Sequence, residues 1–206
     1  MGGMDPLEDA WIGLGANVGS ARASLETAVS TLSMLPGASL AGVSPLYRTR
    51  PVGPVEQDDF LNAVVHLRVP AAVSPEVGAM DVLVALKRLE RALGRVDRQR
   101  WGPREIDLDL LLFGNHRLRV ERAAAARSAD PARGDPQWLE VPHPSARDRL
   151  FVLAPLADLA PQLKPPGWDE TVVRARDRAQ MVAGPGEVRL IATWDAPSGH
   201  WIDSPA

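Results

Sequence analysis

Apolar residues recur along this chain with two periods, the two-residue period of strands and the three-to-four-residue period of helices. In segment 62–69, apolar residues fall at every second position (Ala63, Val65, Leu67 and Val69), which is typical of a half-buried strand. Together the patterns predict strands over 10–15, 39–44, 62–69 and 105–113, and helices over 20–35 and 74–94. This β-α-β-β-α-β order is that of a ferredoxin-like core, so an α+β fold is expected.

Segments outside this core are expected to add further elements. A helix is predicted over 148–159, interrupted near Pro155, and it is followed by a helix over 169–182 and a strand over 187–193. With these additions we expect three layers, α/β/α. Segment 45–60, which contains several Pro and Gly residues, is predicted to be a long irregular loop, and 119–137 a mobile insertion.

Composition narrows the classes of function. The 206 residues have a net charge of −3 and are 45% hydrophobic, which is ordinary for a globular protein and argues against general nucleic-acid binding. Cysteine is absent, which excludes disulfides, zinc–thiolate sites, iron–sulfur clusters and a cysteine nucleophile. No apolar run is long enough to span a bilayer, and the first residues do not resemble a signal peptide. We therefore expect a cytoplasmic protein that does not bind membranes.

Basic residues are concentrated in segment 87–104. This window holds seven basic and two acidic residues, although the chain as a whole is net acidic. The basic residues are Lys87, Arg88, Arg91, Arg95, Arg98, Arg100 and Arg104. Such a local concentration suits a small polyanion better than a long nucleic acid. The alternative is a solvated helix face with charge pairs between neighbouring turns.

Two carboxylates follow this segment directly, at Asp107 and Asp109 in the predicted strand over 105–113. Side chains two residues apart on a strand project from the same face, with Cα atoms about 6.5–7 Å apart. The alternate residues are then expected in the core, namely Ile106, Leu108, Leu110 and Leu112. A pair of carboxylates beside a basic loop suits Mg²⁺ and a polyphosphate. The alternative is an exposed strand face whose carboxylates pair with Arg or Lys.

Two further motifs are ambiguous when taken alone. Segment 13–19, GLGANVG, has the spacing GxGxxxG rather than the GxGxxG of dinucleotide-binding loops, so a tight turn between strand and helix is the preferred interpretation. His143 stands between Pro142 and Pro144, with Arg149 six residues later. A single histidine of this kind is more often structural than catalytic.

Four blocks of sequence together carry a family resemblance. They are GLGANVG, SPLYRTRPVG with the FLNAVV that follows, LERALGRVDRQRWGPREIDLDLLLFG and VPHPSARDRLFVLAPL. In this order they closely resemble the 6-hydroxymethyl-7,8-dihydropterin pyrophosphokinases of folate biosynthesis, over about residues 11–161. The resemblance implies a ferredoxin-like α+β enzyme that transfers the β,γ-pyrophosphoryl group of ATP to the 6-hydroxymethyl oxygen of the pterin and releases AMP.

The resemblance also implies which residues form the site. Two Mg²⁺ ions are expected on Asp107 and Asp109, which form the expected catalytic set with Arg100 and Arg104. The expected ATP-binding residues are Glu90, Arg95, Arg98, Arg100, Trp101, Arg104, Ile106, His143 and Arg149. The expected pterin-binding residues are Thr49, Val52, Phe60, Asn62, Trp101 and Phe151. The chain departs from residues common in the family at Arg50, Asp97, Glu140 and Pro144.

On this interpretation, residues 1–164 form the catalytic domain with the insertion at 119–137, and 165–206 form a C-terminal extension that packs on it. The expected substrates are ATP and the pterin, and a monomer is expected. Two alternatives compete with this hypothesis. A dinucleotide-dependent oxidoreductase is disfavoured by the glycine spacing. A non-catalytic ferredoxin-like module that binds RNA is disfavoured because the sequence has only three Phe and one Tyr.

Overall fold

An antiparallel sheet and four α-helices make up the portion of the chain that this computed structural model describes, residues 6–51, 53, 55–96, 102–128, 134–184 and 186–204. The strands are β1 (Leu7–Ala16), β2 (Ser39–Val43), β3 (Leu46–Thr49), β4 (Phe60–Pro70), β5 (Asp107–Phe113), β6 (Leu118–Glu121), β7 (Trp138–Val141), β8 (Val188–Asp195) and β9 (His200–Asp203). The helices are α1 (Ala21–Ser33), α2 (Pro75–Ala92), α3 (Leu150–Leu159) and α4 (Val172–Val182). The expected α+β class is therefore confirmed.

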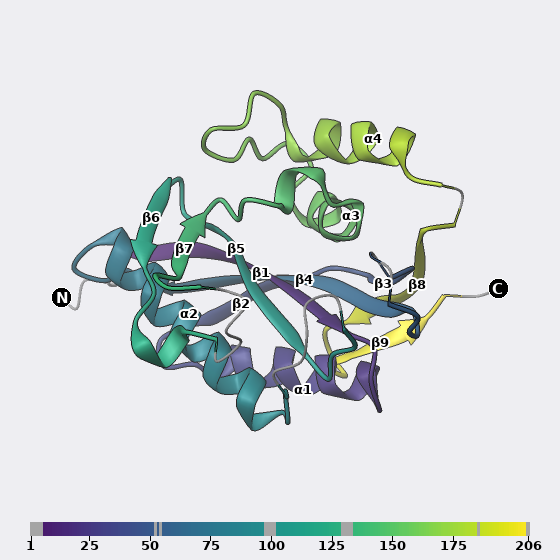
Figure 1. The fold of residues 1–206 in the computed structure, drawn as a ribbon, viewed down its shortest axis with the longest axis horizontal. Coiled ribbons are helices and arrows are strands. Elements are labelled where there is room, and N and C mark those ends of the chain that lie inside the picture. The colour runs from purple at the N-terminus through teal and green to yellow at the C-terminus, as the bar shows by residue number, and fades with distance from the viewer. Residues whose placement is uncertain are drawn as a thin grey trace.

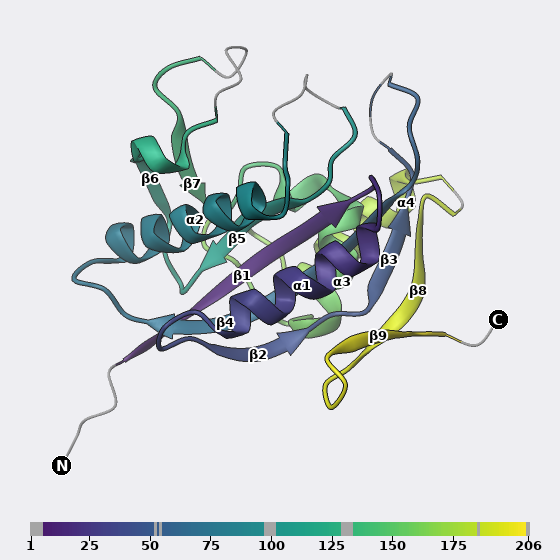
Figure 2. The same ribbon diagram turned by 90° about the horizontal axis from the view of Figure 1, so that it is seen from below.

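The main sheet has the strand order β5-β1-β4-β3-β8-β9, and β2 also pairs with β4. Helices α1 and α2 lie on one face of this sheet, and α3 and α4 lie over the other (Figure 1). Seen from below, α1 and α2 run next to each other across the sheet, and β8 and β9 extend it at one end (Figure 2). Strands β6 and β7 pair with each other in a separate two-stranded sheet.

The sheet is buried on both faces, so two hydrophobic clusters form. One lies between the sheet and α1 with α2, and it includes Leu108 and Leu110. The other lies between the sheet and α3 with α4, and it includes Leu111 and Leu112. The expected burial of Leu108, Leu110 and Leu112 is confirmed, and Leu112 lies in the second cluster. The register between β5 and β1 shifts at this point, and such a bulge reverses the alternation of side chains.

Helix α2 begins where its sequence signals place it. Pro75 occupies the first helical position, and the Ser74 hydroxyl accepts a hydrogen bond from the backbone N–H of Val77 at 3.4 Å. The apolar face of the helix, with Leu83 and Leu86, packs into the first cluster. Its last two turns therefore run alongside β5.

The glycine segment runs along β1 into the predicted turn between strand and helix. Gly13 and Gly15 lie inside β1, which pairs with β4 on one side and β5 on the other as far as Gly15. Only Gly19 lies in the turn that follows, with a φ of +62°, a conformation that favours glycine. The strand and the turn are therefore as predicted, with the strand ending one residue later than expected, at Ala16.

Three expectations need correction. Segment 45–60 is not wholly irregular, because Leu46–Thr49 forms β3 between β4 and β8. The expected insertion 119–137 begins inside β6, which pairs with β7. Helix α3 continues through Pro155. Both faces of α3 are apolar and packed, and this burial offsets the backbone hydrogen bond that proline cannot donate.

The C-terminal strands belong to the main sheet. β8 pairs with β3, and β9 with β8. Trp201 on β9 is 2% exposed, and its indole N–H donates to the carbonyl oxygen of Ser44 at 2.9 Å. Its ring also meets the edge of Trp194 at a centroid distance of 4.8 Å. Trp201, close to the end of the described chain, is therefore part of the hydrophobic core.

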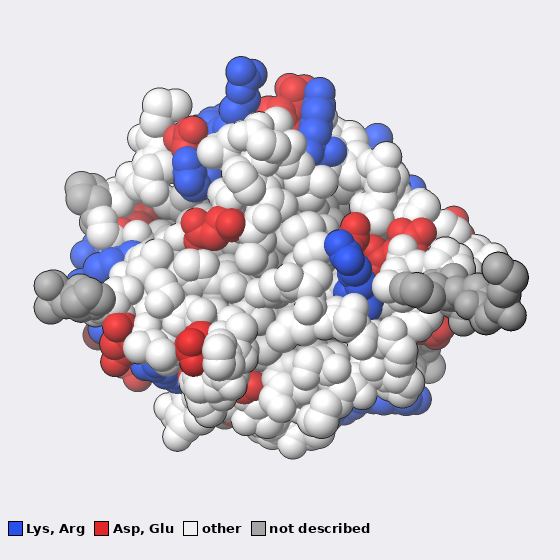
Figure 3. Space-filling view, turned by 180° about the vertical axis from the view of Figure 1, so that it is seen from behind, with Lys and Arg blue, Asp and Glu red and all other residues white. Residues whose placement is uncertain are grey.

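The surface shows acidic and basic side chains next to one another, as seen from behind the view of Figure 1 (Figure 3). None of the helices in the described ranges has both the length and the apolar character needed to cross a membrane.

The buried position of Trp201 leads to a prediction. We expect Trp201→Ala to lower the free energy of unfolding by about 3–5 kcal/mol, because it leaves a large cavity and an unpaired Ser44 carbonyl. Urea denaturation followed by circular dichroism measures this. Ile202→Ala on the same strand is the control, since Ile202 is 55% exposed and should change stability little. Equal effects of the two substitutions would contradict burial of β9.

Candidate active site

Two carboxylates stand on β5 at the edge of the sheet. Asp107 pairs with Gly15 of β1 and Asp109 pairs with Gly13, so both project from the same face, as predicted. Their side chains are 23% and 38% exposed. A side chain at Gly15 would come within 3.0 Å of the Asn62 amide oxygen and 4.0 Å of the Asp107 Cβ atom. Glycine at this position therefore keeps the space between Asn62 and Asp107 open.

Asp107 is held by two guanidinium groups. Arg95 Nη1 lies 2.5 Å from Asp107 Oδ1, and Arg104 Nη1 donates to Oδ2 of the same carboxylate. Each oxygen therefore has a cationic donor, which makes these charge-assisted hydrogen bonds. The predicted grouping of Arg95 and Arg104 with the carboxylates is present in the structure.

Glu90 is the most deeply buried residue of the cluster formed with Asp107, Arg95 and Arg104. It is 2% exposed, and its Oε1 accepts hydrogen bonds from the Leu108 backbone N–H at 2.7 Å, Lys87 Nζ at 2.8 Å and Arg95 Nη1 at 2.5 Å. Lys87 also donates to the Leu108 carbonyl at 2.7 Å. A buried carboxylate is tolerated when it has partners of this kind. Helix α2 thus fixes the backbone of β5 between the two aspartates.

Asp109 lies next to two further groups, Lys87 and His143. Burial opposes the ionisation of Asp109, but Lys87, His143 and Arg104 outweigh it and hold the pKa of this carboxyl well below its ordinary value. Burial lowers the pKa of His143 below its ordinary value, and the Asp109 carboxylate opposes this shift. The backbone N–H of His143 donates to the Leu111 carbonyl at 2.8 Å, which fastens this segment to β5.

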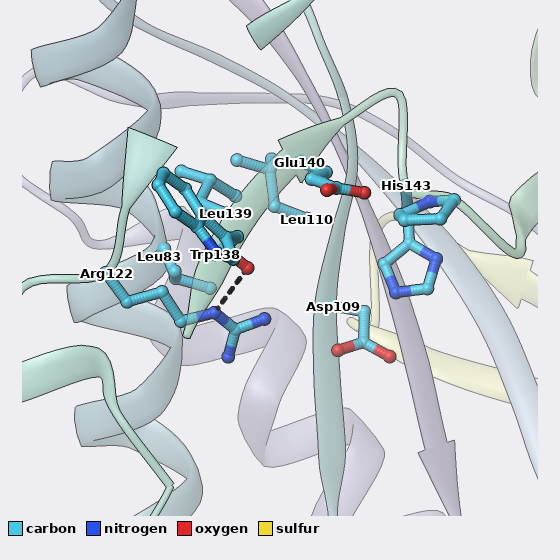
Figure 4. Close-up of a pocket in the computed structure, with 9 residues that line it drawn as sticks. Leu83, Asp109, Leu110, Arg122, Trp138, Leu139, Glu140 and His143 are labelled. Atoms are coloured by element: carbon cyan, nitrogen blue, oxygen red, sulfur yellow. Dashed lines mark hydrogen bonds between the residues drawn. The ribbon is translucent and has the colours of Figure 1, made fainter. Parts of the chain in front are cut away.

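A cleft of about 190 Å³ opens beside Asp109. Asp109 and His143 lie on one side of it and Trp138 on the other (Figure 4). It is lined by Leu83, Asp109, Leu110, Arg122, Trp138, Leu139, Glu140, His143 and Pro144. An aromatic ring, apolar walls and a carboxylate at one end give a pocket suited to a flat, partly apolar ring.

Trp138 of β7 lines this cleft, and the sequence did not indicate it. The Arg119 guanidinium lies over the Trp138 ring, 4.2 Å from the ring centroid. The backbone carbonyl of Trp138 accepts a hydrogen bond from Arg122 Nε at 3.0 Å. Both arginines belong to the predicted insertion 119–137. The pairing of β6 with β7 brings them to the site, and no local pattern indicates that pairing.

Asn17, which sequence reasoning also missed, joins three segments. Its side-chain N–H₂ donates to Gln57 Oε1 at 3.0 Å and to the Asp58 carbonyl at 2.9 Å. Its Oδ1 accepts from the Arg104 backbone N–H at 2.8 Å, and its own backbone N–H donates to the Arg104 carbonyl at 2.9 Å. Asn17 is 8% exposed. It therefore ties the segment that carries Arg104 to the end of β1 and to the chain before β4.

Three of the predicted pterin residues come together at the ends of β3 and β4. Asn62 Nδ2 donates to Thr49 Oγ1 at 2.7 Å, and both residues are buried. Phe60 is the register partner of Thr49. Gly15 lies between Asn62 and Asp107, so this group adjoins the carboxylates.

The remaining predicted residues have different placements. Arg149 and Phe151 lie at the start of α3, with the Arg149 guanidinium 5.7 Å from the centroid of the Phe151 ring. Ile106 is buried in the core, and its carbonyl accepts from Arg95 at 3.4 Å. Val52, Arg98, Arg100 and Trp101 lie outside the described residues, as does Asp97.

The donor set of the cluster suits a hard cation. No group of three or more His, Cys, Asp or Glu side chains in the described ranges is arranged as a complete metal site. Mg²⁺ is usually held by one or two carboxylates together with substrate phosphates, and Asp107 and Asp109 supply carboxylates of that kind. The residues present therefore fit Mg²⁺ that arrives with a phosphate ligand.

Comparison with known protein families identifies the family of this chain. Residues 11–161 match the model of the 7,8-dihydro-6-hydroxymethylpterin-pyrophosphokinase (HPPK) family. The chain belongs to the HPPK family. A 2-amino-4-hydroxy-6-hydroxymethyldihydropteridine pyrophosphokinase from Pseudomonas aeruginosa is 38% identical over 160 residues, 78% of this chain and 85% of the relative. One from Methylorubrum extorquens is 39% identical over 154 residues, 75% and 84% of the two chains.

Solved structures of HPPK-DHPS proteins share the fold of this HPPK chain. A Plasmodium falciparum HPPK-DHPS crystal structure with pterin and p-hydroxybenzoate matches with a TM-score of 0.70 and 14% identity, over 97% of this chain and 49% of that one. The wild-type Plasmodium falciparum HPPK-DHPS matches with a TM-score of 0.68 and 15% identity, over 97% and 50%. The chain therefore spans about half the length of those proteins.

The Asn17 contacts lead to a prediction for this HPPK chain. We expect Asn17→Ala to lower the free energy of unfolding by about 1–3 kcal/mol, because the substitution leaves the backbone groups of Asp58 and Arg104 without their partner. Thermal melting measures the effect. Asn115→Ala, at an exposed position, is the control and should leave the melting temperature unchanged. Identical melting of the two variants would show that Asn17 does not join these segments.

Proposed function

We propose that Asp107 and Asp109 are the centre at which this chain transfers the pyrophosphoryl group of ATP to 6-hydroxymethyl-7,8-dihydropterin, releasing AMP. Membership in the HPPK family makes the chain an ATP-dependent pyrophosphokinase of folate biosynthesis. One observation carries the placement. The aspartates stand between the cleft lined by Trp138 and the buried Thr49–Asn62 pair, so two different flat substrates would meet there.

Magnesium belongs to this reaction class, and we propose two ions on Asp107 and Asp109. When bound, Mg²⁺ neutralises phosphate charge and favours attack on phosphorus. The chain's own contribution is to hold the carboxylates ionised and fixed. Lys87 and Arg104 do this for Asp109 by their charge, and Glu90 does it for both aspartates by anchoring Leu108.

The nucleotide is proposed to occupy the cleft. The apolar walls and the Trp138 ring suit a purine base, and His143 lies at the Asp109 end of the cleft, where the phosphates would lie. Arg149, whose charge acts on His143, is proposed to contact the same phosphates. Arg95 and Arg104 supply cations beside Asp107. Arginine N–H groups not used on the carboxylate can donate to phosphate oxygens, which binds and orients the triphosphate. Arg98, Arg100 and Trp101 complete the proposed set from outside the described residues.

The pterin is proposed to bind against Asn62, Thr49, Phe60 and Phe151, with Val52 and Trp101 from outside the described residues. The Asn62 amide offers both a donor and an acceptor to the polar edge of the ring, and aromatic side chains offer a stacking face. Because this group adjoins Asp107 through Gly15, the hydroxymethyl oxygen would face the phosphates.

The proposed step is an in-line displacement at the β-phosphorus. The hydroxymethyl oxygen forms the new O–P bond as the bond from the oxygen bridging the α- and β-phosphates breaks, and AMP leaves. The hydroxyl proton passes to solvent or phosphate. No general base is required, because positioning and charge stabilisation account for most of phosphoryl-transfer catalysis.

The arrangement of the chain supports further proposals. The antiparallel order β5-β1-β4 with β2 and β3 beyond supports a ferredoxin-like core to which β8 and β9 are added. We propose a single domain in which residues 165–206 extend the catalytic region formed by residues 1–164, acting as a monomer without nucleic-acid or membrane partners. The contacts of Trp201 with Ser44 support the single domain.

The activity test uses the full chain with Mg-ATP and 6-hydroxymethyl-7,8-dihydropterin, separated by anion-exchange chromatography. AMP and the pterin diphosphate are expected as products. ADP in place of AMP would indicate ordinary kinase chemistry, and no turnover would overturn the proposed function.

Asp109→Asn should lower the AMP-forming rate at least about a hundredfold, because the amide keeps the shape of the side chain but removes the charge that binds the cation. The same chromatographic assay measures it, with circular dichroism to verify folding. Asp81→Asn on the exposed side of α2 is the matched control and should keep the full rate. A folded Asp109→Asn variant with the wild-type rate would remove the aspartates from the mechanism.

Phe151→Ala should raise the KM for the pterin about tenfold and leave the KM for ATP nearly unchanged, since it removes a stacking face worth about 1–3 kcal/mol. Initial rates with each substrate varied in turn measure both constants. Val152→Ala, on the next residue of the helix, is the control. A rise in the KM for ATP alone would place Phe151 beside the nucleotide.

A further inference from the structure

Lys87 is a cation in the site that neither the motifs nor the proposed substrate contacts explain. Its ammonium lies 2.7 Å from the Leu108 carbonyl oxygen, 2.8 Å from Glu90 Oε1 and 3.7 Å from Asp109 Oδ1. Its side chain is only 13% exposed. Two of its N–H groups thus donate to fixed neighbours, and the Asp109 carboxylate lies within ion-pair distance of the same nitrogen.

The position of Lys87 is set by rigid elements on both sides. It lies on α2 one turn before Glu90 and one turn after Leu83, which lines the cleft. The backbone of Leu108 is held from the other side by β1, whose Leu14 is its register partner. Unlike an exposed lysine, Lys87 therefore cannot move its charge away from Asp109 without breaking two short hydrogen bonds.

The charges in this cluster balance. Among the described residues in mutual contact there, three carboxylates (Glu90, Asp107 and Asp109) meet three cations (Lys87, Arg95 and Arg104). A divalent ion alone would add two positive charges to this neutral cluster, next to the fixed ammonium of Lys87. A divalent ion that arrives with a triphosphate adds net negative charge, which the same cations favour.

We propose that Lys87 is a positioning residue whose fixed positive charge makes divalent-ion binding at the aspartates depend on the nucleotide. The proposal rests on the proposed function, because it takes Asp107 and Asp109 as the metal ligands. Lys87 disfavours the metal alone by sharing Asp109 with it, and it favours the polyphosphate. The metal would then enter with ATP, rather than occupy the site first.

The test measures binding and needs no turnover. Free Mn²⁺ is titrated into the full chain without nucleotide and followed by electron paramagnetic resonance. ATP is titrated separately in the presence of EDTA by calorimetry. In Lys87→Gln, whose amide still donates to Glu90 and Leu108, Mn²⁺ should bind about tenfold tighter and metal-free ATP several-fold weaker. These opposite shifts distinguish a charge effect from a structural one, since damage to the fold would weaken both.

The chain offers a matched control in Lys164, its only other lysine, which is exposed. Lys164→Gln removes the same charge elsewhere and should leave both affinities unchanged, and Lys87→Arg, which keeps the charge, should hold Mn²⁺ affinity near the wild-type value. If Lys87→Gln does not fold, Lys87→Met, which keeps the apolar stem, carries the same expectation. Unchanged or weaker Mn²⁺ binding in a folded neutral variant would overturn the proposal.

Asp109→Asn separates this inference from the proposed function. It should abolish Mn²⁺ binding in both the wild-type and the Lys87→Gln background. If Mn²⁺ binding survives Asp109→Asn, the aspartates are not the metal ligands and both proposals fail. If Asp109→Asn abolishes binding but Lys87→Gln does not tighten it, only the role of Lys87 is overturned.

Discussion

β5 is an edge strand, so the backbone groups on its outer side need hydrogen-bond partners that do not come from another strand. The side chains that provide these partners also form the site. β5 is the first strand in the sheet order, and the N–H and C=O of Leu108 bond to α2 side chains instead of to β1. Unpaired backbone groups at a sheet edge are costly when buried and a hazard when exposed. Glu90 accepts the N–H and Lys87 donates to the C=O, so two side chains of opposite charge complete the edge of the sheet. Because these side chains also contact Arg95 and Asp109, the backbone requirement and the electrostatics of the site form one network.

Residues distant in sequence hold the other elements of the site against this edge. Asn17 connects the end of β1 to the Arg104 backbone and to the Asp58 carbonyl. On the opposite face, Arg178 of α4 donates to the Arg147 carbonyl at 2.9 Å and pairs with Glu170, which braces the segment between His143 and α3. Surface ion pairs of this kind contribute little stability singly, but here they restrain one short segment beside the cleft. Helix α4 therefore restrains the segment beside the cleft, while β8 and β9 extend the sheet.

Local sequence was sufficient to predict helices and strands with a strong hydrophobic period or clear capping residues. It was insufficient where pairing with a distant strand determines the structure. The pattern of 62–69 and the signals around Ser74 predicted β4 and α2, and the spacing of Asp107 and Asp109 predicted their shared face. β3 has only four residues and exists because β4 and β8 pair with it from both sides. The bulge opposite Trp11 has no local signal, and neither has the role of Asn17, whose partners lie 40 to 87 residues away. Trp138 and Arg122 were missed because a pairing of strands, rather than composition, brings their segment to the cleft.

Arginine and lysine have different uses in this cluster, and their donor groups explain why. A guanidinium has five N–H donors in a planar fork, so Arg95 and Arg104 can each hold Asp107 through Nη1 and still have N–H groups for a phosphate. An ammonium has three donors, and at Lys87 two of them bond to Glu90 and Leu108, while Asp109 lies at ion-pair distance. Replacing Arg104 by lysine or Lys87 by arginine would therefore alter the hydrogen-bond geometry in each case. A lysine at position 104 could not bridge carboxylate and phosphate by a fork. A guanidinium at position 87 would keep the charge, but its planar fork would not match the Glu90 and Leu108 oxygens around one nitrogen. On the proposed function, direct contact with the triphosphate would fall to the arginines, and Lys87 would act through its charge.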